Sequence, residues 1–249
     1  MSADPVKKLR ALAADAPAYE PPQSIDGSDA VLGELLYAFL LWEAGARTAS
    51  NALKRLRAEV VDANEFRICT PDEIVAILGP RYPRAKERGE RLHACLNAIY
   101  EREHSLSLES LHASPKRETR SYLDSLPGVP PFVAARVFLL AIGGHAFPVD
   151  QRLAAILAGL ELGEPDMDEL QRAAWMERQV RAGESRDLYL ALEHAAESPG
   201  VTRKKPAARS TSKAAGSRSS RSASKPATKP TKKPSSKSKS RSSKAAGKK

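Results

Sequence analysis

The chain has 249 residues, of which 41% are apolar and 28% charged, and it has two cysteines, a composition typical of a soluble, largely globular protein. Its net charge of +10 is unevenly divided, because residues 200–249 hold 17 of the 40 Lys and Arg residues and no Asp or Glu. The other 23 basic residues and all 30 acidic ones give residues 1–199 a net charge of −7. The basic character therefore belongs to the tail and not to the fold.

Several classes of site are excluded by the same composition. Cys69 and Cys95 are too few for a cubane iron–sulfur cluster, which needs four thiolates. The five histidines show no metal-ligand spacing with these cysteines, so neither a metal nor a cofactor is expected. No stretch approaches the roughly 18 apolar residues of a membrane span, so we expect a protein that works in water, as a monomer.

The N-terminal part of the chain divides into an arm and the start of a fold. Residues 1–28 are rich in proline, which predicts a mobile arm or short linker. A helix is predicted from Ala30, because apolar residues then recur every three or four positions, at Val31, Leu32, Leu35, Leu36, Phe39 and Leu40. The Thr-Pro-Asp-Glu sequence at 70–73 predicts a capped helix start, and the Gly-Pro pair at 79–80 predicts the end of that helix.

Helical periodicity continues to about residue 195, and no run of strand-type alternation is longer than about five residues. We therefore predict an all-α domain over residues 29–198. From residue 199 to 249 the composition is almost entirely Lys, Arg, Ser, Ala, Pro and Thr, which predicts a disordered basic tail. Its Lys-Pro units resemble the tails of linker histones, and its cations are expected to contact DNA phosphates, among them Lys204, Lys205, Lys232 and Lys233.

The most informative window is Leu-Pro-Gly-Val-Pro-Pro-Phe at 126–132, followed by an apolar helix and then by Val149-Asp150. Leu126 ends one helix, a tight turn follows, and Pro130 or Pro131 opens the next helix, which gives a helix-hairpin-helix. Backbone N–H groups at such a turn can bind a DNA phosphate. We expect the contact to involve Pro127, Gly128, Val129 and Val133.

This window resembles the helix-hairpin-helix DNA glycosylase superfamily, whose pattern is Leu-Pro-Gly-Val-Gly, a helix and a Val-Asp pair. Phe132 and Asp150 are 18 residues apart, the endonuclease III spacing between lysine and aspartate. The Tyr-Pro-Arg-Ala-Lys sequence at 82–86 is similar to a second family region. The resemblance implies a two-lobed helical fold that binds double-stranded DNA and rotates one nucleotide out. It also implies that Asp150 stabilises the sugar cation or activates the nucleophile.

The sequence departs from the family pattern at three points. Phe132 stands where bifunctional members have the lysine that forms a Schiff base, so lyase activity is not expected and water would attack instead. Pro130 and Pro131 lack two N–H groups that could meet phosphate. The four-cysteine cluster of endonuclease III is also absent, so no iron–sulfur cofactor is expected.

Three functions stay open on this reasoning. The first is a monofunctional DNA glycosylase of base-excision repair that uses Asp150 and water. The second is a non-catalytic DNA-binding protein with a degenerate glycosylase domain and a histone-like tail, in which Asp150 is an ordinary helix N-cap and Phe132 is core. The third is a helical interaction module. The sequence does not name the base, and a lysine-rich tail suits a bacterial nucleoid or a eukaryotic nucleus equally.

Overall fold

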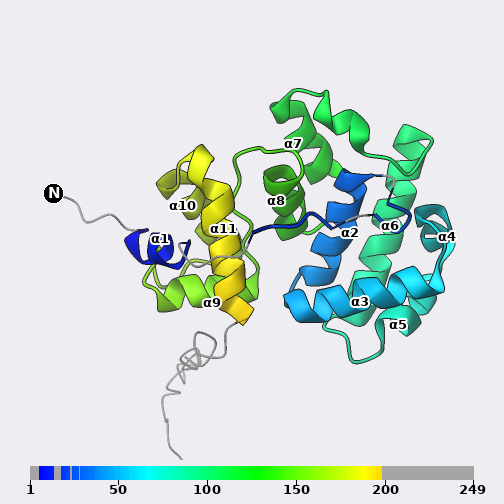
Figure 1. The fold of residues 1–249 in the computed structure, drawn as a ribbon, viewed down its shortest axis with the longest axis horizontal. Helices are drawn as coiled ribbons and strands as arrows, with labels where there is room; N and C mark the ends of the chain where they lie inside the picture. The colour runs from blue at the N-terminus through cyan, green and yellow to red at the C-terminus, as the bar shows by residue number, and fades with distance from the viewer. Residues whose placement is uncertain (1–5, 14–17, 23, 28, 198–249) are drawn as a thin grey trace, which may run out of the picture. The chain divides into compact units, whose positions relative to one another are not determined.

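A computed structural model describes residues 6–13, 18–22, 24–27 and 29–197 (Figure 1). The described residues form eleven α-helices, one short 3-10 helix and no strand, so the predicted all-α fold class is confirmed. In chain order they are α1 (Lys7–Ala13), α2 (Ala30–Leu41), α3 (Ala46–Glu59), α4 (Ala63–Ile68), α5 (Pro71–Leu78), α6 (Ala85–Glu103), η1 (Glu109–His112), α7 (Lys116–Ser125), α8 (Pro131–Leu140), α9 (Gln151–Gly159), α10 (Glu169–Gln179) and α11 (Ala182–Glu197).

The helices form two lobes, and α11 contacts both. In the first lobe α2 packs against α3, α6 and α8. Helix α6 also packs against α4 and α5, and α7 packs against α8. In the second lobe α1 lies along α11, and α9 contacts both α10 and α11 (Figure 1). Because α11 also touches α3 and α8, the two lobes share packing contacts.

The predicted central helix is α2, and nearly all of its surface is buried. The apolar positions that predict it, Val31, Leu32, Leu35, Leu36, Phe39 and Leu40, are all at most 1% exposed. A helix that is buried all round must be surrounded by other helices, as α2 is. This helix therefore fixes the positions of α3 and α8, which bear on the candidate site.

The predicted start of α5 is also confirmed. The N–H of Glu73 donates to Thr70 Oγ1 at 3.3 Å, and the N–H of Thr70 donates to Glu73 Oε2 at 2.7 Å. These two bonds form a capping box, with Pro71 at the first helical position. The bond from the Thr70 N–H is the main reason that the pKa of Glu73 is lowered.

Part of the predicted N-terminal arm belongs to the fold. Val6 and Leu9 are fully buried, and α1 packs along α11. Arg10 forms an ion pair with Glu184 at the start of α11, with 2.8 Å between Nη2 and Oε2. The prediction of a mobile arm is therefore wrong for residues 6–13, because a short apolar face here has a partner more than 170 residues away in sequence.

The predicted tail at 199–249, with Lys204, Lys205, Lys232 and Lys233, lies outside the described residues. Within the described part of the chain, no helix is both long enough and apolar enough to span a membrane.

Replacing Leu9 tests whether α1 contributes to stability. Leu9→Ala removes a fully buried side chain and leaves a cavity, so we expect the free energy of unfolding to fall by roughly 2–4 kcal/mol. Leu170→Ala is the matched control, because Leu170 is 58% exposed and its truncation should change the free energy by less than about 0.5 kcal/mol. Urea denaturation of both variants measures the difference. Equal stabilities would show that α1 is not part of the cooperative fold.

Candidate nucleic-acid interface and acidic site

The predicted helix-hairpin-helix is formed by α7, residues 126–130 and α8. Gly128 has a φ of +79°, and a Cβ at this position would lie 2.5 Å from the carbonyl oxygen of Arg91 on α6. Only glycine fits such a left-handed turn pressed against another backbone. Arg91 Nη1 donates to the carbonyl of Gly128 at 3.2 Å, and the N–H of Val129 donates to Leu126 at 3.3 Å. The turn is therefore seated on α6.

The hairpin presents few backbone donors. The N–H of Gly128 has no acceptor among the described residues, while Pro130 and Pro131 have no N–H to offer. Pro127 is exposed at the tip, and Val129 is half-buried. Val133 is fully buried and its N–H donates to the carbonyl of Pro130 at 2.9 Å, and its expected contact with DNA stays a prediction.

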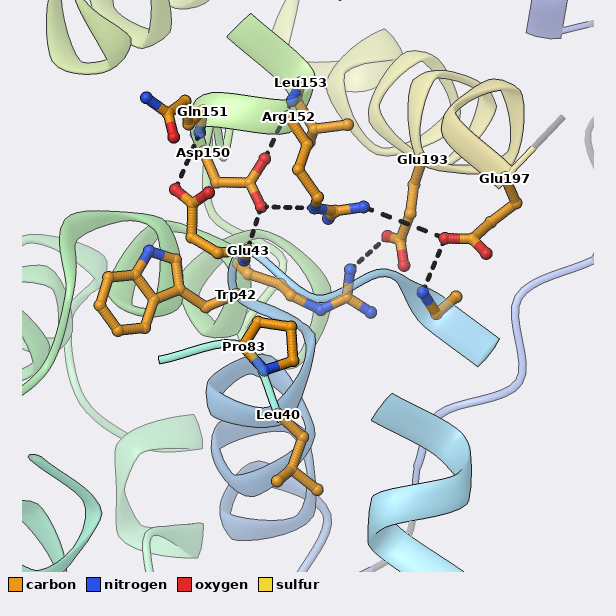
Figure 2. A network of polar contacts seen from close by, with 12 residues as sticks. Leu40, Trp42, Glu43, Pro83, Asp150, Gln151, Arg152, Leu153, Glu193 and Glu197 are labelled. Atoms are coloured by element: carbon orange, nitrogen blue, oxygen red, sulfur yellow. Dashed lines mark hydrogen bonds and ion pairs between the residues drawn. The ribbon is translucent and has the colours of Figure 1, made fainter. Parts of the chain in front are cut away.

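Asp150 is the N-cap of α9 and lies inside the protein (Figure 2). Its Oδ1 accepts the N–H of Leu153 at 2.9 Å, and its Oδ2 accepts the N–H of Glu43 and the Nε of Arg152, both at 2.9 Å. The side chain of Asp150 has 0% exposure. The structure therefore keeps the predicted acid close to a helix start but gives it no open face.

Glu43 is the partner of Asp150 that the sequence does not predict. It follows α2 with a φ of +59°, an uncommon conformation for a residue with a Cβ. Its Oε1 accepts the N–H of Gln151, the residue after Asp150, at 3.1 Å, while its own N–H donates to Asp150 Oδ2 (Figure 2). Burial raises the pKa of the Glu43 carboxyl. Unlike Asp150, Glu43 is partly exposed.

Arg152 continues this set of contacts toward α11 and α3. Its Nη1 lies 3.9 Å from Glu197 Oε1, and the same oxygen accepts the N–H of Ala46 at 2.7 Å. A Cβ on Gly45, which has a φ of +89°, would come within 2.9 Å of that oxygen. We call Glu43, Asp150, Gln151, Arg152 and Glu197 the Asp150 network; it connects the ends of α2 and α11 to the start of α9.

Phe132 is 3% exposed and lines a small cavity of about 110 Å³ with Phe147, Val149 and other residues. None of the residues around this cavity is a lysine, so no amine stands ready there to form a Schiff base. This placement agrees with the interpretation of Phe132 as part of the core or of a pocket wall.

A group of arginines surrounds Trp42 beside the hairpin. The guanidinium carbons of Arg84, Arg88 and Arg91 lie 4.8, 5.5 and 5.4 Å from the centroid of the Trp42 ring. Arg88 is fully buried, its Nε and Nη1 have no partner, and burial lowers its pKa to about 10. Arg84 and Arg91 both pair with Glu87 and are partly exposed, so they are the cations of this group that a DNA strand could reach.

Comparison with known proteins identifies the fold. No family model matches the sequence, and no curated protein matches it. The fold resembles that of a trapped endonuclease III–DNA covalent intermediate, with a TM-score of 0.58 and 15% identity over 76% of this chain and 81% of that one. It also resembles a thermostable thymine-DNA glycosylase, with a TM-score of 0.56 and 19% identity over 80% and 87% of the two chains.

A third similar structure is the H. pylori 3-methyladenine DNA glycosylase MagIII bound to 1,N6-ethenoadenine, with a TM-score of 0.56 and 18% identity over 78% and 94% of the two chains. The chain therefore has the helix-hairpin-helix glycosylase fold, as its motif predicts. Within the described residues, no group of three or more His, Cys, Asp or Glu side chains is placed to hold a metal ion.

The close approach of Gly128 to Arg91 gives a test of the hairpin. Gly128→Ala should lower the free energy of unfolding by at least about 1 kcal/mol, because the new methyl group meets a backbone carbonyl and requires a left-handed φ. Gly159→Ala is the control: this helical glycine has open space around it, so alanine should be neutral or slightly stabilising. Thermal denaturation distinguishes the two outcomes, and equal melting temperatures would contradict the hairpin geometry.

Proposed function

We propose that this protein binds duplex DNA without excising a base, and that the hairpin holds the sugar–phosphate backbone. The supporting observation is the N–H of Gly128, which has no acceptor among the described residues and lies next to the start of α8. Such a donor beside a helix N-terminus suits a phosphate oxygen. Arg91, which contacts the Gly128 carbonyl, adds a partly exposed cation at the same place. A solved structure with a similar fold, a trapped endonuclease III–DNA covalent intermediate, is a complex with DNA, which supports the proposal.

The basic tail supplies a second source of affinity in this proposal. Residues 200–249 hold 17 cations and no acidic residue, whereas residues 1–199 have a net charge of −7. Attraction to phosphates must therefore come largely from the tail, and counterion release makes such binding salt-dependent and independent of sequence. The hairpin, which has lost two donors to proline, contributes position more than affinity.

The absence of excision follows from the state of Asp150. An acid that stabilises the sugar cation must come close to that sugar, but the side chain of Asp150 has no exposure and three internal hydrogen bonds. Phe132 offers no nucleophile in place of the family lysine. In this proposal Asp150 caps α9 and holds the Asp150 network together.

Base excision by a monofunctional DNA glycosylase is the second candidate function. The observation in its favour is that Asp150 lies at a helix start 18 residues after Phe132, the spacing of the family motif, in a chain with the glycosylase fold. In this case DNA binding would release Asp150 from Arg152 or from the Glu43 N–H, and water would attack the sugar. A Schiff base through Phe132 is impossible in either function.

An assay for abasic sites separates the two functions. Duplexes with uracil, 8-oxoguanine, oxidised pyrimidines, alkylated purines or adenine mismatches are incubated with the full chain and then treated with alkali. We expect no cleavage of any of them. Cleavage that disappears in Asp150→Asn would establish the second candidate, and borohydride trapping would show that an amine elsewhere in the chain forms a Schiff base.

If Asp150 has a structural role, replacing it should change the free energy of unfolding. Asp150→Asn removes the charge that pairs with Arg152, so we expect the free energy of unfolding to fall by roughly 2–4 kcal/mol. Asp187→Asn, at an exposed position on α11, should change it by less than about 0.5 kcal/mol. An Asp150→Asn variant as stable as the wild type would contradict the proposed structural role of Asp150.

The contribution of the tail is tested by deleting residues 200–249. We expect the affinity for undamaged duplex to fall steeply, together with the dependence of log K on log[salt], because most of the released counterions are lost. A tail of the same composition in scrambled order should restore both quantities. Fluorescence anisotropy over a salt series measures them, and an unchanged slope after deletion would contradict this division of labour.

A further inference from the structure

A groove on the first lobe carries positive charge and no acidic group. It measures about 440 Å³ and lies between Thr48 and Arg55 of α3 and residues 78–83, which connect α5 to α6 (Figure 1). None of the residues that line it is an aspartate or a glutamate. We call it the α3 groove. A hollow lined by charge of one sign attracts a ligand of the opposite sign, so this groove favours an anion.

The connection from α5 to α6 is held in place, so the α3 groove is already shaped. The phenol of Tyr82 is buried and donates to the carbonyl of Leu40 at 2.7 Å, and the N–H of Tyr82 donates to the carbonyl of Gly79 at 2.9 Å. Leu78, the last residue of α5, is 1% exposed. A ligand that enters a preformed groove has little chain to order, which favours its binding.

Two arginines bring their charges to the α3 groove. Arg55 Nη2 donates to the carbonyl of Leu78 at 2.6 Å, which holds this guanidinium against residues 78–83. The other nitrogen atoms of Arg55 make no hydrogen bond with a described residue. Arg81 is exposed and forms no hydrogen bond or ion pair within the described part of the chain. Guanidinium groups with unused N–H donors suit the oxygens of a phosphate.

The exposed face of α3 adds to this positive field. Arg47, Lys54 and Arg57 are exposed, and Glu59, its last residue, is the only acidic side chain of the helix. Residues 1–199 have a net charge of −7, so this concentration of cations is local to the first lobe. A local positive field attracts a polyanion even where the net charge is negative.

A line of cations connects the α3 groove to the hairpin. Arg84 comes directly after Pro83, the last residue of the groove. Arg84 and Arg91 both lie beside the Trp42 ring, and Arg91 donates to the carbonyl of Gly128. Along α6 the step from Arg84 to Arg91 is about 10 Å, which corresponds to about three phosphates of one DNA strand.

We propose that the α3 groove binds a phosphate group, with Arg55 and Arg81 as its cations and the hydroxyl of Thr48 as a further donor. The line of cations to the hairpin favours the DNA backbone as the source of this phosphate, and that source rests on the proposed DNA binding. The hairpin then holds one phosphate and the α3 groove a second one, which orients the duplex on the first lobe. A free phosphate ester presents the same oxygens, so the test includes one.

Replacing Arg81 tests the contact in the full chain. Arg81→Gln should weaken binding to undamaged duplex several-fold and lower the slope of log K against log[salt] by about 1, because one phosphate contact is lost. Lys54→Gln is the matched control, since it removes the same charge from α3 outside the groove, and it should leave the slope nearly unchanged. Fluorescence anisotropy over a salt series measures both slopes, and melting curves verify that both variants fold.

Protection of arginines from phenylglyoxal locates the phosphate and identifies its source. The reagent modifies accessible guanidinium groups, and mass spectrometry of peptides identifies the modified residues. We expect the duplex to protect Arg81 and Arg91, while Arg178, which is exposed on α10, stays reactive. Protection of Arg81 by inorganic triphosphate but not by the duplex would assign the α3 groove to a free phosphate ester.

Two outcomes would overturn the site itself. One is an Arg81 that stays reactive in the presence of both the duplex and triphosphate. The other is an equal fall in slope for Lys54→Gln and Arg81→Gln, which would indicate a diffuse field and no specific site. Protection of Arg91 alone by the duplex would refute the groove as a DNA contact and leave the proposed function standing. Protection of Arg81 by triphosphate, with no binding of the duplex, would refute only the proposed function.

Discussion

The arrangement of the two lobes depends on the hydrogen bonds and ion pairs of the Arg136 guanidinium. It projects from α8 and binds a carboxylate of α2 on one side and Glu193 and Tyr189 of α11 on the other. Burial alone would disfavour its charge, but the surrounding acidic and phenolic groups outweigh this effect and raise its pKa. Loss of one partner in such a cluster leaves an uncompensated buried charge, which is strongly destabilising. The lobes are therefore joined by a specific polar contact as well as by apolar packing.

The Asp150 network connects three helices through backbone and side-chain hydrogen bonds. In this chain Asp150 satisfies the N–H groups of Leu153 and Glu43, and Glu43 in turn satisfies that of Gln151. Asp150 and Glu43 together accept N–H groups in the first turn of α9, and Asp150 also holds the residue that follows the C-cap of α2. These contacts hold Glu43 in its uncommon backbone conformation and give Asp150 a structural part at the start of α9.

Local signals in the sequence predict α2, the capping box of α5 and the hairpin, because apolar spacing and turn residues determine these features within a few positions. The cap function of Asp150 is also predictable, but its burial is not, since two of its partners are Glu43, over 100 residues away, and Arg152, whose conformation depends on Glu197. The sequence likewise misses α3, whose start at Gly45 has no side-chain cap. Contacts distant in sequence, such as Arg136 with Glu193, need the assembled fold.

The energetics of the network bear on whether DNA could activate Asp150. Its release from Arg152 and the Glu43 N–H would cost several kcal/mol, and extrusion of a nucleotide costs a few more. Only contacts that are stronger in the open state than in the closed state can offset these costs. Binding by a tail of 17 cations does not discriminate between the two states, so its affinity leaves their populations unchanged. Any opening must therefore be driven by the hairpin, where Pro130 and Pro131 have no N–H to donate.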